Sequence, residues 1–197
     1  MSMKLTKLIS ALVLLSASTV GLSSEWNVDN SNSELHFISV KKGNIAEIHQ
    51  FTNLNGSLDS DGNFELAIDL TSVDTSNPIR DERMKNFLFE TNRFTDALLS
   101  AKIDPAELDA IAEGANKRLL IDAKLTLHGM KKSVPLEVIV TRLVGAKFSA
   151  TSATPIILNV GDFSLVAGVE KLRELAKLPS ISYAVPVTFH LTLKLNK

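Results

Sequence analysis

Cysteine is absent from this chain of 197 residues. The fold therefore contains no disulfide bond and has no thiolate available for chemistry. A lipid-anchored lipoprotein is also excluded, because its anchor is attached to a cysteine. Burial of apolar side chains alone must hold the fold together, and a chain of this length can build a core of sufficient size.

Motifs of several enzyme classes are missing as well. The chain has no Gly-x-Ser-x-Gly, no His-Glu-x-x-His and no glycine-rich phosphate loop, so hydrolase, zinc-protease and nucleotide-binding functions have no motif to support them. The four histidines, which are His36, His49, His128 and His190, are not spaced as pairs of metal ligands. We interpret them as surface or hydrogen-bonded side chains, and only strands that meet in space could assemble a metal site from them. We expect no metal, no cofactor and no catalytic residue.

Basic clusters are lacking too. Lys and Arg are not gathered into a block and do not alternate with aromatic residues, which makes nucleic acid an unexpected partner. Internal repeats, low-complexity tracts and linkers rich in Pro or Gly are also absent. The chain beyond its first residues is therefore predicted to be one domain.

The N-terminus has the order of features typical of a secretory signal peptide. Lys4 and Lys7 precede an apolar run over residues 8–15, and small residues follow that fit cleavage after Ser23 or after Ser18. The run is too short to span a bilayer, and it lacks the apolar stripe of a buried N-terminal helix, the alternative interpretation. We predict a signal peptide over residues 1–23, export to the periplasm and no stable membrane span.

The mature domain is predicted to cover residues 24–197. It contains 19 Lys and Arg against 22 Asp and Glu, a net charge of −3. Strict alternation of apolar and polar residues over 185–195, 64–70 and 119–127 indicates strands with one dry and one wet face. Several such strands in a small chain predict an all-β fold, an antiparallel barrel around an apolar interior.

The remaining elements follow from hairpin and helix signals. We expect about eight strands with short helices in the connections. Asn77 and Pro78 mark the start of one helix, and Asp104 and Pro105 mark another that ends near Gly114. The other predicted elements are strands over residues 34–41, 45–58, 64–73, 97–103, 119–128, 134–143 (with a turn over 129–133), 147–154 and 156–160, and a helix over 169–176.

Six short motifs resemble those of the YceI-like family. They are LTSVDT at 70–75, RDERM at 80–84, FLF at 87–89, RFTDA at 93–97, LTLHG at 125–129 and DFSL at 162–165. Their order and spacing extend the resemblance from Trp26 almost to the C-terminus. It implies an exported, lipocalin-like barrel that binds a polyisoprenoid or a similar amphiphile inside. Two departures are RFTD in place of the family's KYP or KFP, and a segment over 166–180 whose role as a lid stays open.

The apolar residues are the candidates for contact with a lipid tail. For a generic barrel of this size a filled core is expected, but the resemblance and slim inward residues such as Val187 favour an open interior. The predicted tail-binding residues are Phe37, Phe64, Leu66, Ile68, Phe87, Leu125, Val138, Val140, Val187, Phe189 and Leu191.

Two arginines are the candidates for contact with a lipid headgroup. Arg80 and Arg83 lie about one helical turn apart and could present a cationic face to a phosphate or carboxylate. The alternative is structural ion pairing with Asp81, Glu82, Glu90 or a carboxylate on a neighbouring strand. Lys171 and Arg173 are weaker candidates for the same contact.

The predicted function is an exported carrier or scavenger of a polyisoprenoid, such as a polyprenyl phosphate or a quinone. One alternative is a barrel hydrolase or isomerase that acts on such a lipid. Another is a stress-related exported barrel with a filled core that acts through a protein partner. The identity of the lipid, its donor and acceptor, the cleavage site and the oligomeric state, with a dimer among the options, stay open.

Overall fold

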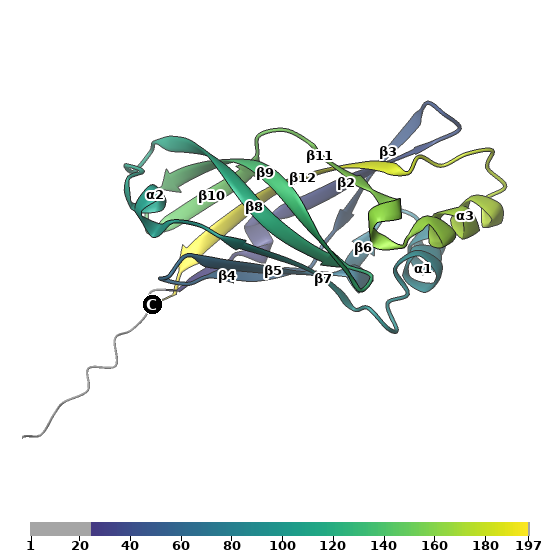
Figure 1. Ribbon diagram of the computed structural model, residues 1–197, viewed down its shortest axis with the longest axis horizontal. Helices are drawn as coiled ribbons and strands as arrows, with labels where there is room; N and C mark the ends of the chain where they lie inside the picture. The colour runs from purple at the N-terminus through teal and green to yellow at the C-terminus, as the bar shows by residue number, and fades with distance from the viewer. Residues whose placement is uncertain (1–24, 197) are drawn as a thin grey trace, which may run out of the picture.

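The computed structural model describes residues 25–196, so the predicted signal peptide lies outside the described residues. One continuous sheet curls into a closed antiparallel barrel (Figure 1), which confirms the prediction of an all-β fold. Its strands are β1 (Trp26–Val28), β2 (Glu34–Lys41), β3 (Ile45–Phe51), β4 (Leu54–Leu58), β5 (Asn63–Asp69), β6 (Val73–Asp74), β7 (Asp96–Lys102), β8 (Asn116–Leu127), β9 (Met130–Leu143), β10 (Lys147–Ser152), β11 (Ile156–Asn159) and β12 (Ala184–Leu195).

Several of these strands share one position in the wall, which leaves an eight-stranded barrel. Both β1 and β2 pair with β12 on one side, and on the other side β1 pairs with β4 and β2 with β3. This arrangement closes the ring. The segment predicted as one strand over 45–58 is interrupted at Thr52 and Asn53, whose backbone N–H groups bond instead to the carbonyl and hydroxyl of Ser72.

The hairpin between β8 and β9 is tighter than the sequence suggested. Leu127 pairs directly with Met130, so the turn consists of His128 and Gly129 and not of residues 129–133. Both turn residues have positive φ, at 50° and 75°. That backbone conformation suits the right-handed twist of the strands and extends the ladder by several pairs.

Short helices occupy the connections. Asn77 caps α1 (Pro78–Arg83) by accepting a hydrogen bond from the backbone N–H of Arg80, as predicted, and α1 continues into a π-helix, η3 (Met84–Phe89). The helix capped by Asp104 is shorter than expected, α2 (Pro105–Asp109), whereas α3 (Val166–Leu175) begins before the predicted 169. Three 3₁₀ turns are η1 (Asn30–Asn32), η2 (Leu70–Ser72) and η4 (Val160–Phe163).

The helices are divided between the two ends of the barrel. In Figure 1, α1 and α3 lie at one end, where the hairpin of β2 and β3 also projects, and α2 lies at the other end. Leu108 and Ile111 are buried beneath the α2 end. Among residues 25–196, no helix has the length and apolarity needed to cross a bilayer.

Candidate functional site

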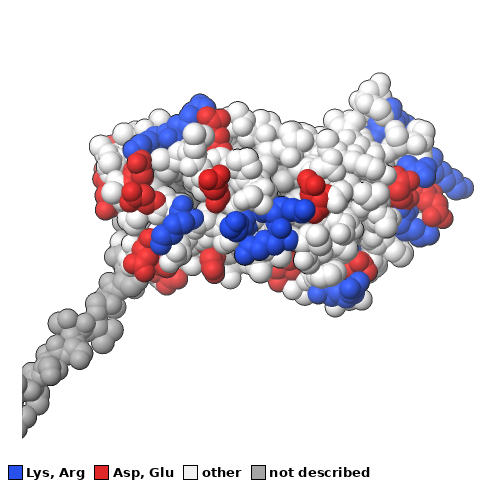
Figure 2. All heavy atoms as spheres, in the orientation of Figure 1, with Lys and Arg blue, Asp and Glu red and all other residues white. Residues whose placement is uncertain are grey.

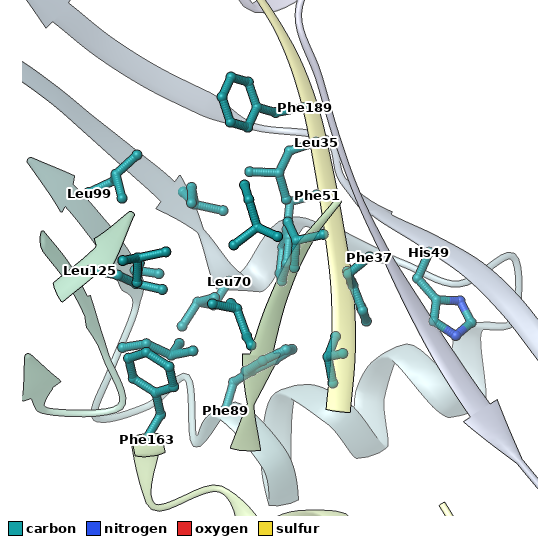
Figure 3. Close-up of a pocket in the computed structure, with 18 of the residues that line it drawn as sticks. Leu35, Phe37, His49, Phe51, Leu70, Phe89, Leu99, Leu125, Phe163 and Phe189 are labelled. Atoms are coloured by element: carbon teal, nitrogen blue, oxygen red, sulfur yellow. The ribbon is translucent and has the colours of Figure 1, made fainter. Parts of the chain in front are cut away.

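The interior of the barrel contains a cavity of about 690 Å³. Its wall is formed by inward-facing apolar side chains of the strands, and Figure 3 shows Leu35, Leu99, Leu125 and Phe189 pointing into it. The volume lies within the range of roughly 300–1,000 Å³ that is usual for small-molecule sites. The barrel is therefore not filled by its own side chains.

Most of the predicted tail-binding residues line this cavity. Strand alternation places them there, since residues two apart on a strand face the same side. The ten that line it are Phe37, Phe64, Leu66, Ile68, Leu125, Val138, Val140, Val187, Phe189 and Leu191. Their contact with a ligand stays a prediction.

Phe87 is the exception, and its prediction as a cavity residue was wrong. It is absent from the wall and its side chain is 44% exposed. The prediction assumed α-helical spacing, but the wider turn of the π-helix η3 shifts the inward face by one residue. Met84, Leu88 and Phe89 face the cavity in its place.

An aromatic cluster, of which the sequence predicted only Phe37, lies toward the helical end of the cavity. The rings of Phe37 and Phe51 stack with centroids 5.3 Å apart, and Phe89 packs against Phe51 at 5.6 Å. Figure 3 shows all three, with Phe163, around the cavity. Alternation within 45–58 could have identified Phe51, whereas only the π-helix explains Phe89. Val169 and Leu172 bring α3 into the same wall, so the 166–180 segment forms part of the site.

The polar groups of the wall belong to the helical end. We call this end the mouth. It is formed by the β2–β3 hairpin, by α1 with η3, and by α3 with the segments that flank it. The polar lining residues are Ser39, Lys41, Glu47, His49, Asn77, Arg80, Arg83, Asn159 and Ser182. The cavity thus has an apolar depth and a polar entrance, the division that an amphiphile requires.

Arg80 is held by neighbouring groups at the mouth. Its guanidinium forms an ion pair with Glu47 on β3, and it also donates to the hydroxyl of Thr75 at 2.9 Å and to the Thr75 carbonyl at 3.1 Å. Lys41 pairs with the same carboxylate at 2.8 Å. The hydrogen bond from Lys41, together with the charge of Arg80, holds the pKa of Glu47 below its usual value. Ion pairing with a carboxylate on a strand, the alternative weighed above, therefore describes Arg80.

Arg83 is in a different situation. It lines the cavity and donates only to the carbonyl of Leu175, at 3.5 Å, at the C-terminal end of α3. Within residues 25–196 it forms no ion pair. Because a carbonyl does not neutralise a guanidinium, the positive charge of Arg83 remains available at the mouth.

His49 is a buried polar side chain in the cavity wall. Only 3% of it is exposed. Its Nε2 lies 2.8 Å from the hydroxyl of Ser39, but its Nδ1 has no hydrogen-bond partner among the described residues. Burial, and then the charge of Arg80, lowers the pKa of His49, so the imidazole is neutral at neutral pH. The sequence predicted a surface or a hydrogen-bonded side chain. His49 is buried, and only its Nε2 has a hydrogen-bond partner among the described residues. Within residues 25–196, no cluster of three His, Asp or Glu side chains could hold a metal ion.

The fold and the cavity define a lipocalin-like barrel, the class of small antiparallel barrel that can hold one elongated ligand in its interior. Residues 26–193 match the model of the YceI-like domain, and the chain belongs to that family. The resemblance found in the sequence is therefore confirmed. A search of curated protein sequences finds no significant match.

Solved structures share this fold. One is a polyisoprenoid binding domain from Saccharophagus degradans implicated in plant cell wall breakdown, with 34% identity and a TM-score of 0.85, covering 87% of this chain and 98% of that one. Burkholderia cenocepacia BcnA has 17% identity and a TM-score of 0.62, covering 84% and 98%. The Campylobacter jejuni YCEI protein has 15% identity and a TM-score of 0.53, covering 76% and 84%. The last two comparisons concern the fold alone.

Proposed function

We propose that the protein binds a long isoprenoid, or a comparable amphiphile, in the barrel cavity and acts as its carrier or scavenger. The observation that carries this proposal is the apolar cavity whose polar lining groups all belong to the mouth. A similar structure with 34% identity is a polyisoprenoid binding domain, which supports the choice of ligand class. Polyprenyl phosphates and quinones both combine such a tail with a polar head.

Tail burial should supply the affinity. Each buried methylene-sized group contributes roughly 0.8 kcal/mol, so about 20 carbons would give on the order of 15 kcal/mol before ordering costs of about 4–15 kcal/mol. An ion pair with a headgroup at the water's edge contributes only about 0–1 kcal/mol. The residues at the mouth would then determine orientation and selectivity.

A lipid hydrolase is the enzymatic alternative, and Ser39 with His49 is the arrangement closest to it. A serine hydroxyl beside an imidazole is the start of a nucleophile–base pair. The Nδ1 of His49, however, has no carboxylate partner in the described chain, so the hydrogen bond by which a triad carboxylate holds the ring and stabilises its charged form is missing. We therefore favour binding over turnover. Release of alcohol from prenyl or acyl esters by the wild type, but not by Ser39→Ala, would reverse this choice.

We also propose export to the periplasm, on the basis of the signal-peptide pattern. The mature chain should then begin at or near Ser24 and fractionate outside the cytoplasm. Mass analysis of the correctly localised protein tests this, and an intact Met1 in that fraction would contradict it.

The ligand proposal is tested by extracting lipid from protein purified without detergent. Mass spectrometry should find one class of long isoprenoid in near-stoichiometric amount. An empty protein, or a mixture of phospholipids in the proportions of the cell membrane, would overturn the proposal. An empty protein that captures a specific protein partner would favour the third alternative.

A further inference from the structure

The mouth carries a charge opposite to that of the rest of the molecule. Residues 41–47, 78–89 and 159–182 surround it, and they contain eight Lys and Arg against six Asp and Glu. The remainder of the described chain contains ten Lys and Arg against 16 Asp and Glu. Figure 2 shows blue side chains beside red ones at the end formed by α3 and the β2–β3 hairpin, and another blue group over the middle of the visible face. The molecule is thus an electrostatic dipole with its positive pole at the mouth.

Part of this positive charge is free to act on a partner. Lys42, Arg83 and Lys177 form no ion pair among residues 25–196, whereas Lys85, Lys171 and Arg173 each pair with an exposed carboxylate three residues away. Lys42 and Lys177 are exposed and occupy tight turns with φ of 53° and 51°. Neither lines the cavity, so the two charges face outward from the rim.

Apolar side chains lie exposed on the same elements. Ile79 on α1 is 67% exposed although it also borders the cavity, Phe87 on η3 is 44% exposed, and Ile45 in the β2–β3 hairpin is 41% exposed. Exposed apolar residues grouped at a binding site, and not scattered singly, indicate an interaction surface. Apolar side chains surrounded by cations have the chemistry of proteins that rest on a charged bilayer.

We propose that the mouth docks on an anionic lipid bilayer, with Ile79, Phe87 and Ile45 entering the interfacial region and Lys42 and Lys177 contacting headgroups. This inference rests on the proposed function. An isoprenoid tail crosses open water at a high free-energy cost, so a carrier gains by opening its cavity directly on the membrane. Ile79, exposed on one side and in contact with the cavity on the other, lies on that path.

The experiment is co-flotation of the mature protein with vesicles. Vesicles of phosphatidylcholine alone are compared with vesicles of equal parts phosphatidylcholine and phosphatidylglycerol. We expect binding to the anionic vesicles only, weakening as salt is added. Each basic residue at an anionic surface contributes a factor of about five, so Lys42→Glu with Lys177→Glu should weaken binding at least tenfold.

Two matched controls separate docking by the mouth from general attraction. Lys124 and Lys131 are exposed on the outer wall of β8 and β9 and form no ion pair in the described part of the chain, and reversing both makes the same change in net charge. Their double variant should bind as the wild type does. Phe87→Ser should weaken binding about fivefold, whereas Leu120→Ser, at an outer-wall position that is 84% exposed, should not.

Several outcomes overturn the inference. The first is a wild-type protein that does not float with anionic vesicles, and the second is one that floats equally well with neutral vesicles. The third is an equal loss of vesicle binding in the mouth variants and the outer-wall variants. The fourth is a mouth variant that keeps its vesicle binding and loses the binding of a protein partner. The lipid content of the Lys42→Glu, Lys177→Glu variant keeps this test apart from the proposed function. If the variant retains isoprenoid and the wild type does not float, docking on the membrane is refuted and the proposed ligand is not. If the wild type floats but contains no isoprenoid, the proposed ligand is refuted.

Discussion

At the scale of single residues, the two arginines of the mouth have different roles. Arg80 supports the fold, whereas the charge of Arg83 is available to a ligand. Arg80 is engaged by Glu47 and Thr75, and the Thr75 hydroxyl in turn donates to Asp81 at 2.6 Å. Among the residues that the structure describes, Arg83 donates only to a backbone carbonyl. From the sequence alone, both arginines were equal candidates for a headgroup contact. The sequence could not show that Arg80 lies beside Glu47, which is 33 residues away in the chain.

We predict that Arg83→Gln selectively weakens binding of a polyprenyl phosphate relative to a prenol of equal tail length. The expected difference is about 1 kcal/mol at low salt, since the contact is near solvent. Competition binding with the two ligands measures it. Arg80→Gln serves as the comparison and should mainly lower the free energy of unfolding, because it leaves Lys41 as the sole partner of Glu47. Equal losses for both ligands in Arg83→Gln would assign Arg83 a structural role.

His49 should make stability depend on pH in a defined window. Burial lowers its pKa in the folded state, whereas the unfolded chain titrates near pH 6.5. Below about pH 6.5 the imidazole is protonated in the unfolded state but still neutral in the folded state. The free energy of unfolding therefore decreases as the pH is lowered from about 6.5 to the pKa of His49 in the folded state. Above about pH 6.5 His49 contributes no pH dependence.

His49→Phe tests this assignment. The variant leaves the Ser39 hydroxyl without its partner, which costs about 1 kcal/mol at every pH. Urea unfolding at pH 7 and at pH 5.5 should show a smaller decline for the variant than for the wild type. Since the two proteins share every other ionisable group, the same decline in each would show that His49 is not the group responsible.

At the scale of elements, the close contact between α3 and η3 holds the mouth together. A Cβ atom on Gly168 of α3 would lie 2.6 Å from the Phe87 carbonyl oxygen and 2.8 Å from the Leu88 Cα. Both are backbone atoms and cannot move aside as a flexible side chain would. Only glycine lets the two helices approach this closely, a requirement that the sequence analysis did not detect.

Gly168→Ala should therefore destabilise the protein by about 1–3 kcal/mol, as overpacking does. Helix propensity alone predicts the opposite sign, since alanine in place of glycine usually stabilises a helix by roughly 0.5–1 kcal/mol. Thermal or chemical unfolding of the variant decides between the two. An increase in stability would mean that α3 does not pack on η3 as described.

The π-helix η3 shows which part of this helical segment could be predicted from local sequence. Sequence spacing located the helix and its cap at Asn77 correctly, because those signals are local. The one-residue shift within η3 depends on tertiary packing. It exposed Phe87, against the prediction, and turned Phe89 inward, a position that the sequence had not assigned to the cavity.

At the scale of the whole molecule, alternation in the strands was sufficient to predict a barrel and to place part of its inner wall. Period two alone assigns Leu66, Ile68, Val138 and Val140 to one face, and the structure places them around one cavity. Closure of the ring depends on β1, only three residues long, pairing with both β4 and β12. Pairing between segments so far apart in the chain has no local sequence pattern, so the sequence could not predict how the ring closes. For the same reason it could not predict that the polar lining residues lie together at the mouth.

The central claim, that the ligand occupies the barrel cavity, is tested most directly by native mass spectrometry of two variants. Val187→Trp adds volume inside the cavity, whereas Ile157→Trp adds the same aromatic ring to the neighbouring strand at a position that is 62% exposed. An open cavity accepts the added volume, so the folded Val187→Trp protein should lose the lipid that copurifies with the wild type, and Ile157→Trp should retain it. Unchanged lipid content in Val187→Trp, or equal loss in both variants, would contradict the account.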